Sequence, residues 1–167
     1  MKHRLAVIDT SWLCVLLAVP GKDRCDGDLH LTTVEAQLEF EEKVGQNYRF
    51  VLPLATVIET GKSYRTAGTR RRETAQRLVE IVQDAAKQRS PWIVFSQQLD
   101  NWQPEALGWL DTWPDFADAR LSIGDMTIKQ VADYYSRMGY EVEMLTCDKQ
   151  LKVHQPASPV RRPRRDL

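Results

Sequence analysis

Short apolar runs alternate along the chain with longer segments in which apolar residues recur every three or four positions. The short runs predict buried strands, and the longer segments predict amphipathic helices. Strands that alternate with helices are typical of an α/β domain with a mainly parallel sheet. We therefore expect an α/β fold with a parallel sheet of four or five strands, four of which are expected at residues 5–8, 48–52, 91–95 and 141–146.

Helix signals fall between these runs. Residues 11–19 predict a short buried helix that ends at Pro20-Gly21, and a polar loop follows it. Thr32 and Glu35 have the spacing of a capping box, which predicts a helix that ends near Gly45. The remaining helical segments are expected from residue 54, over 69–88, in short pieces between 97 and 121, and over 124–138 before Gly139.

Length and composition favour one ordinary globular domain. The 167 residues can bury a sizeable core, and we expect the domain at residues 1–154. Residues 155–167 form a basic tail rich in Pro and Arg that lacks the apolar residues for a core. The 23 basic and 23 acidic residues cancel, so any attraction for nucleic acid must come from local patches.

Two features predict a cytoplasmic protein with no membrane partner. No apolar run approaches the length that a membrane-spanning helix needs. The three cysteines, Cys14, Cys25 and Cys147, are scattered and odd in number. Such a set predicts reduced thiols rather than a disulfide framework.

Carboxylates occupy related positions after the expected strands. Asp9 and Asp148 directly follow strands, Glu59 lies in the helix after the second strand, and Asp125 opens the last long helix. In a parallel sheet with right-handed crossovers, these positions lie on one side of the molecule. Clustered carboxylates raise one another's pKa, and a hard divalent cation such as Mg²⁺ or Mn²⁺ relieves that repulsion. The pattern indicates a metal site able to act on a phosphodiester.

Each of these carboxylates also has a purely structural interpretation. Asp9 could cap the helix at 11–19, and Asp125 has capping-box spacing from Ser122. Glu59 could be an exposed helix residue, and Asp148 could belong to a turn. Their shared placement favours one site, because independent structural roles do not predict it. The competing acidic residues are Asp111, Asp115, Asp118 and Asp133.

Four segments carry a resemblance to a known family: AVIDTS, LPLATVIE, SIGDMTIKQVA and MLTCDKQL, in this order. They resemble the motifs of PIN domains, metal-dependent nucleases that act mostly on RNA. The resemblance covers the chain from about Leu5 to Leu151, and Met126 departs from the alanine common in the family. It implies a three-layer α/β/α sandwich around a parallel sheet.

The resemblance also implies the site residues. The catalytic, metal-binding acids would be Asp9, Glu59, Asp125 and Asp148, holding Mg²⁺ or Mn²⁺ directly or through water. Asp118 is an additional ligand candidate, because the segment 97–121 is longer than in compact members of the family. Hydroxyls that would support the metal ligands are Thr10 or Ser11 and Thr146.

The implied activity is hydrolysis of RNA phosphodiester bonds by an activated water, without a covalent enzyme intermediate. Many small single-domain PIN proteins are toxins of toxin–antitoxin pairs, usually dimeric and silenced by a partner protein. The resemblance therefore also suggests a homodimer, an antitoxin or other regulatory protein as partner, and RNA as substrate.

Basic residues are candidates for substrate binding. Arg70, Arg71 and Arg72 stand at the start of an expected helix, and Lys62 shares a helical face with Glu59. Such cations could contact phosphates of RNA, as could the arginines of the tail. Arginines at a helix start oppose the helix dipole, which favours a role other than stability. A solvated helix start and a solubilising tail are the alternative.

Two other functions compete with the nuclease. One is a non-catalytic PIN-like module that binds RNA or protein, although such a module has no need of all four acids. The other is a phosphatase of the haloacid-dehalogenase type, which also begins with a strand and an aspartate. That class needs a second aspartate two residues later, where this chain has Ser11.

Overall fold

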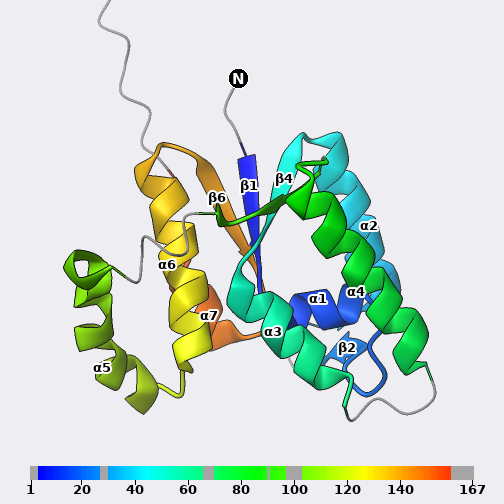
Figure 1. The fold of residues 1–167 in the computed structure, drawn as a ribbon, viewed down its shortest axis with the longest axis horizontal. Coiled ribbons are helices and arrows are strands. Elements are labelled where there is room, and N and C mark those ends of the chain that lie inside the picture. Colours follow the sequence, from blue (N-terminus) through cyan, green and yellow to red (C-terminus); the bar gives the residue numbers. More distant parts are fainter. Residues whose placement is uncertain (1–3, 27–29, 66–69, 90, 97–102, 159–167) are drawn as a thin grey trace, which may run out of the picture.

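The computed structural model describes residues 4–26, 30–65, 70–89, 91–96 and 103–158 (Figure 1). Its centre is a four-stranded parallel sheet in the order β5-β4-β1-β6. Helices cover both faces of this sheet, so the expected α/β/α sandwich is confirmed. The strands are β1 (Arg4–Ile8), β4 (Tyr48–Leu52), β5 (Trp92–Val94) and β6 (Glu141–Leu145).

β1 lies between β4 and β6 and is buried on both of its faces. Successive side chains of a strand point to opposite faces. Ala6 and Ile8 therefore join one half of the core, whereas Leu5 and Val7 join the other. A strand covered on both sides needs an apolar run without polar alternation, which is why the sequence already predicted this strand.

Different helices cover the two faces of the sheet (Figure 1). On the face of Ala6 and Ile8, buried side chains come from α1 (Thr10–Leu16), α2 (Thr33–Gly45) and α4 (Arg71–Ala86). On the opposite face they come from α6 (Ile123–Arg137) and α7 (Lys149–Lys152). The remaining long helix, α3 (Leu54–Ser63), contacts both α1 and α6 and so connects the two layers.

The capping signals in the sequence are confirmed at α2 and α6. The Thr32 hydroxyl accepts a hydrogen bond from the Glu35 N–H, and the Glu35 carboxylate accepts one from the Thr32 N–H. Ser122 and Asp125 form the same reciprocal pair at the start of α6. These local bonds satisfy backbone donors that a helix start would otherwise leave unpaired.

The long segment before α6 forms short helical pieces, as expected. A 3₁₀ helix, η2 (Pro104–Thr112), leads directly into α5 (Trp113–Asp118). Gly139 follows α6 with φ of +87°, a conformation that favours glycine and ends the helix. Residues 97–102 lie outside the described part of the chain.

The structure corrects the predicted loop after α1 and the predicted state of the cysteines. A small antiparallel pair, β2 (Arg24–Cys25) with β3 (Leu31–Thr32), stands where a loop was expected. Cys25 and Cys147 form a disulfide, with their Cα atoms 5.8 Å apart, whereas Cys14 is free and buried. The prediction of reduced thiols was therefore wrong for this pair. The two cysteines are 122 positions apart and meet only through the fold, so no local spacing reveals their pairing.

The chain remains ordered just beyond the expected domain end. Gln155, assigned by the sequence to the tail, accepts a hydrogen bond from the Met144 N–H at 3.0 Å. Residues 159–167 lie outside the described residues, so the expected basic tail lies largely beyond them. Within the described ranges, none of the helices combines the length and apolar character needed to cross a membrane.

Candidate functional site

The carboxyl ends of β1 and β6 mark a reversal in the order of the sheet. The chain places β4 and β5 on one side of β1 and then adds β6 on the other side. Ligands of open α/β sheets bind in the crevice outside the strand ends at such a reversal. The Asp9 N–H donates to the Leu145 carbonyl at 2.9 Å, which places Asp9 beside the loop that follows β6.

Asp9 is held in this position by several donors. Its carboxylate accepts hydrogen bonds from the Thr10 N–H at 2.6 Å and from the Ser11 N–H at 3.3 Å, so it caps α1. The Ser11 and Thr146 hydroxyls also donate to it, the latter at 2.7 Å. Only 5% of Asp9 is exposed, and these bonds compensate for the burial of its charge. The capping interpretation of Asp9 is therefore compatible with a place in a site.

The hydroxyls predicted to support the acids, those of Thr10, Ser11 and Thr146, all form hydrogen bonds with carboxylates of the site. Ser11 Oγ accepts a hydrogen bond from the Cys147 N–H, and Thr146 Oγ1 accepts one from the Asp148 N–H, both at 2.9 Å. Through these two hydroxyls, Asp9 is linked to the loop that carries Asp148. Thr10 Oγ1 donates to Glu59 Oε2 at 3.3 Å, which links Asp9 to α3.

Glu59 approaches the start of α6 because Gly124 has no side chain. A Cβ at position 124 would lie 2.3 Å from Glu59 Oε1, well inside van der Waals contact. Gly124 is buried at this point, so no solvent gap separates the two helices. The glycine therefore allows the carboxylate of α3 to lie against the helix that carries Asp125. No local sequence signal marks this role of Gly124, because the approach depends on how α3 and α6 pack.

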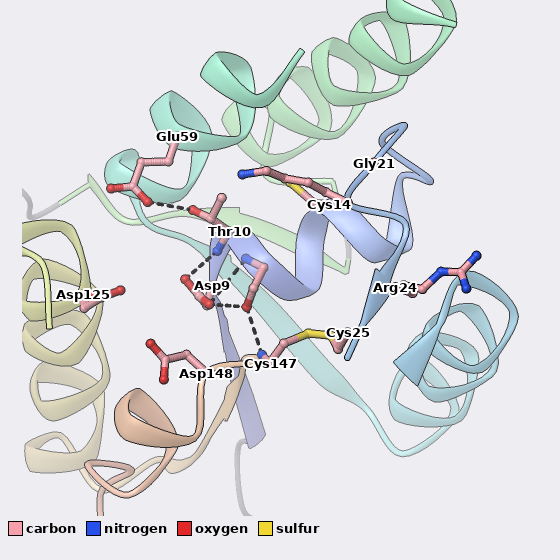
Figure 2. Close-up of a pocket in the computed structure, with 12 residues that line it drawn as sticks. Asp9, Thr10, Cys14, Gly21, Arg24, Cys25, Glu59, Asp125, Cys147 and Asp148 are labelled. Carbon is pink, nitrogen blue, oxygen red and sulfur yellow. Dashed lines mark hydrogen bonds between the residues drawn. A yellow bond between two sulfur atoms is a disulfide. The ribbon is translucent and has the colours of Figure 1, made fainter. Parts of the chain in front are cut away.

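Asp125 and Asp148 each cap a helix with one carboxylate oxygen. Asp125 Oδ2 accepts from the Ser122 N–H, and Asp148 Oδ1 accepts from the Gln150 N–H, both at 2.7 Å. Their other oxygens, and Glu59 Oε1, accept no hydrogen bond from the described residues. Figure 2 shows Glu59, Asp125 and Asp148 around the space beside Asp9. These three carboxylates thus keep an oxygen available to a ligand.

The four predicted acids line one pocket of about 330 Å³. The pocket also contains residues that the sequence did not single out, because no local motif marks them. Two of them, Lys22 and Arg24, are basic residues that alternate with Asp23 in the segment after α1. The complete lining is Asp9, Thr10, Ser11, Cys14, Gly21, Lys22, Arg24, Cys25, Glu59, Asp125, Cys147 and Asp148.

The electrostatics of the pocket disfavour a full set of negative charges. Burial raises the pKa of Glu59, and the charges of Asp125 and Asp9 raise it further against the opposing hydrogen bond from Thr10. Burial likewise raises the pKa of Asp125, where Asp9 and Asp148 add to the effect and the Ser122 hydrogen bonds oppose it. A bound cation would relieve this repulsion.

The donor set fits a hard divalent ion, although the side chains do not form a ready coordination group. Carboxylate oxygens are the ligands that Mg²⁺ and Mn²⁺ prefer. As they stand, the described residues include no cluster of three or more Asp, Glu, His or Cys side chains able to hold a metal. Mg²⁺ usually keeps several water ligands, so the four acids could hold it partly through water.

The other predicted residues lie outside this pocket. Asp118 is exposed on α5, and Arg70 and Arg72 line a separate pocket beside Glu73. Arg70 forms an ion pair with Glu73 at 2.9 Å. Lys62 is exposed on α3, where its charge lowers the pKa of Glu59, against the larger effect of burial that raises it. Among the competing acids, Asp133 pairs with Lys129, whereas Asp111 and Asp115 are exposed and do not line the pocket.

Comparison of the chain with protein-family models, with curated proteins and with solved structures finds no match. Membership of the PIN family therefore stays a prediction, based on the four motifs and on the positions of their acids.

Replacement of Asp125 tests the repulsion inside the pocket. A carboxyl group whose pKa is raised by folding destabilises the folded state above that pKa, and this cost disappears as the pH falls through it. Asn at position 125 could still accept the capping hydrogen bond from Ser122. We therefore expect metal-free Asp125→Asn to unfold at a higher temperature than the wild type near neutral pH, with the difference shrinking toward about pH 4.

Thermal unfolding in EDTA at several pH values would measure this effect. Asp115→Asn is the matched control, because Asp115 is exposed outside the pocket. An Asp125→Asn variant that is less stable than the wild type at every pH would show that the carboxylate is net favourable there.

Proposed function

We propose that this protein is a divalent-metal-dependent ribonuclease of PIN type. The observation that carries the proposal is the convergence of Asp9, Glu59, Asp125 and Asp148 on one pocket. They come from the end of β1, from α3, from the start of α6 and from the start of α7. From described donors, Asp9 accepts three hydrogen bonds at Oδ2 and one at Oδ1, whereas each of the other three carboxylates keeps an oxygen that no described donor uses.

Each of the four acids would have a role around a bound cation. Mg²⁺ or Mn²⁺ bound there would polarise the phosphodiester and lower the pKa of the attacking water. Asp9 would be the fixed ligand, since Ser11 and Thr146 prevent its carboxylate from turning away. Glu59, Asp125 and Asp148 would complete the charge at the reacting phosphate, directly or through water.

Glu59 distinguishes this proposal from the non-catalytic alternative, a PIN-like module that binds RNA or protein. Asp9, Asp125 and Asp148 all cap helices, which gives them a structural use in any function. Among the described residues, Glu59 caps no helix and accepts only the 3.3 Å hydrogen bond from the Thr10 hydroxyl. A half-buried carboxylate with so little structural use favours catalysis. The phosphatase is disfavoured, because Ser11 uses its hydroxyl to contact Asp9 and the Cys147 N–H.

The PIN resemblance extends the proposal to a biological role. The protein would act in the cytoplasm on RNA, as the toxin of a toxin–antitoxin pair, as a homodimer and under the control of an antitoxin or another regulatory protein. Arg70, Arg71, Arg72 and Lys62 would contribute to binding of the RNA outside the pocket.

Incubation of end-labelled single-stranded RNA with the purified protein in Mn²⁺, in Mg²⁺ and in EDTA tests the activity. We expect cleavage that requires the ion and that falls strongly in Glu59→Gln. Binding of RNA without cleavage under all conditions would contradict the nuclease and favour the non-catalytic module. Hydrolysis of a phosphomonoester instead of RNA would favour the phosphatase.

Gly124→Ala tests whether cleavage depends on the position of the Glu59 carboxylate, because it leaves the four acids unchanged. The new methyl group would displace the end of the flexible Glu59 side chain, which is the nearest atom to it. Gly124 is the second residue of α6, where alanine also has the higher helix propensity, so we expect the free energy of unfolding to be maintained. We expect RNA cleavage to fall, measured alongside denaturant unfolding. Gly45→Ala is the control, since nothing lies within 4 Å of a Cβ there. Unchanged cleavage in Gly124→Ala would argue against a role for Glu59.

A further inference from the structure

We propose that Lys22 and Arg24 bind backbone phosphates of the RNA substrate at the rim of the acidic pocket. This inference rests on the proposed function and adds a substrate-binding surface that lies apart from the arginine run at 70–72. Both residues line the pocket that contains Asp9, Glu59, Asp125 and Asp148. The pocket therefore has a carboxylate side and a basic rim.

The backbone holds Lys22 in a defined place. The turn at Gly21, with φ of +79°, reverses the chain after α1, and the Lys22 N–H donates to the Val19 carbonyl at 2.8 Å. The Val19 N–H in turn donates to the Cys14 carbonyl at 2.9 Å. The Lys22 ammonium acts electrostatically on the Cys14 thiol. Burial raises the pKa of this thiol, and the charge of Lys22 is among the effects that lower it. The ammonium is thus close to a residue of the pocket wall.

Arg24 is held by β2 and by the disulfide beside it. Its backbone pairs with Thr32 of β3, and the Thr33 hydroxyl donates to the carbonyl of Asp23 at 3.1 Å. The next residue, Cys25, is bonded to Cys147, which directly precedes Asp148. The covalent link therefore connects the basic rim to the loop of a catalytic acid. Figure 2 shows Arg24 directed away from the carboxylates, which suits contact with a phosphate of the RNA at a distance from the reacting phosphate.

The charges of Lys22 and Arg24 are available for a ligand. Neither forms an ion pair with the described residues, although both are exposed. Other cations of the fold do have such partners, such as Lys43 with Glu143 and Lys129 with Asp133. Two exposed cations beside clustered carboxylates suit a polyanion that brings one phosphate to a metal and its neighbouring phosphates to the rim.

Binding and cleavage of single-stranded RNA by Lys22→Gln/Arg24→Gln test this inference. In an Asp9→Asn background with Mn²⁺, RNA affinity is measured by fluorescence anisotropy at several salt concentrations. Each lost phosphate contact should reduce the slope of log affinity against log salt by about 0.7, and two contacts by about 1.4. In the otherwise wild-type chain, KM should rise while kcat changes little, because the acids are untouched.

The matched control is Lys87→Gln/Arg137→Gln, which removes the same charge from exposed positions at the ends of α4 and α6. These positions lie near the amino ends of β5 and β6, away from the pocket. The control should keep the wild-type affinity and salt slope. Arg72→Gln measures separately what the arginine run contributes.

The outcomes separate this inference from the proposed function. If the wild type cleaves RNA and the Lys22→Gln/Arg24→Gln variant matches the control in KM and salt slope, the basic rim is refuted while the nuclease stands. If nothing is cleaved but the variant alone loses affinity and salt dependence, the rim is supported and the nuclease fails. An equal loss in the variant and in the control would also overturn the rim, since it would reflect overall charge.

Discussion

Asp9→Asn is expected to reduce metal-dependent cleavage of RNA by more than about 100-fold. Loss of groups that merely orient a metal ligand already costs about 10- to 100-fold. Asp9 is proposed as a direct ligand, and four donors hold it in one position. The substitution removes the negative charge at the point where β1 meets the pocket. Cleavage rates in Mn²⁺ measure the effect.

The fold should survive this substitution. Asn caps a helix about as well as Asp, and its oxygen can still accept from the Thr10 N–H. Its amide would face the Ser11 and Thr146 hydroxyls, which can rotate to accept a hydrogen bond. We expect the free energy of unfolding to change by about 1 kcal/mol or less. Asp9→Ala, which leaves the donors unpaired, should cost more.

Asp115→Asn is the control, because Asp115 is exposed on α5 and does not line the pocket. Asp118→Asn tests separately whether Asp118 is an additional ligand, as the sequence suggested. A folded Asp9→Asn variant that still cleaves at the wild-type rate would refute the proposed site. Should Asp9→Asn fail to fold, Glu59→Gln decides the same question, because Glu59 caps no helix.

Reduction of the Cys25–Cys147 disulfide is expected to lower the free energy of unfolding by about 2–4 kcal/mol. The bond joins residues 122 positions apart, so it restricts most of the unfolded chain. In the folded state the disulfide joins β2 to the loop after β6, two segments that are far apart in the sequence. Denaturant unfolding with and without a dithiol reductant measures the loss.

Cys25→Ser/Cys147→Ser is the companion variant. It should be as unstable as the reduced wild type, and the reductant should not affect it further. The Cys14 thiol is buried and takes part in no disulfide, and because both proteins contain it, it serves as an internal control. A reductant that leaves the wild type equally stable, or two free thiols titrated at these positions in the native protein, would contradict the disulfide. The thiol count also bears on the cytoplasmic assignment, since disulfides are rare in that compartment.

Much of the architecture was determined by patterns within a few residues. The apolar run of β1 predicts a strand buried on both faces, because water is excluded from each side of a central parallel strand. Thr32 with Glu35 and Ser122 with Asp125 predict helix starts, because each pair makes its hydrogen bonds inside one turn. Asp9 could be located in the same way, because it directly follows the apolar run of β1. Its charge is nevertheless buried, and four hydrogen bonds compensate for that burial.

The contents of the pocket were decided by tertiary structure. Gly124 matters only because α3 packs against α6 and brings Glu59 to it. Thr146 reaches Asp9 across 137 positions, and Cys25 reaches Cys147 across 122. Arg24 lies at the pocket beside Cys25, which the disulfide joins to the loop after β6, and Lys22 follows the turn at Gly21. Local sequence encodes the hydrogen bonds within a helical turn and the apolar pattern of a strand, whereas contacts at such separations depend on closure of the whole sheet and its helices. The sequence by itself thus predicted the sandwich, the acids and their supporting hydroxyls, and the tertiary structure supplied the partners of those hydroxyls, the glycine, the disulfide and the basic rim.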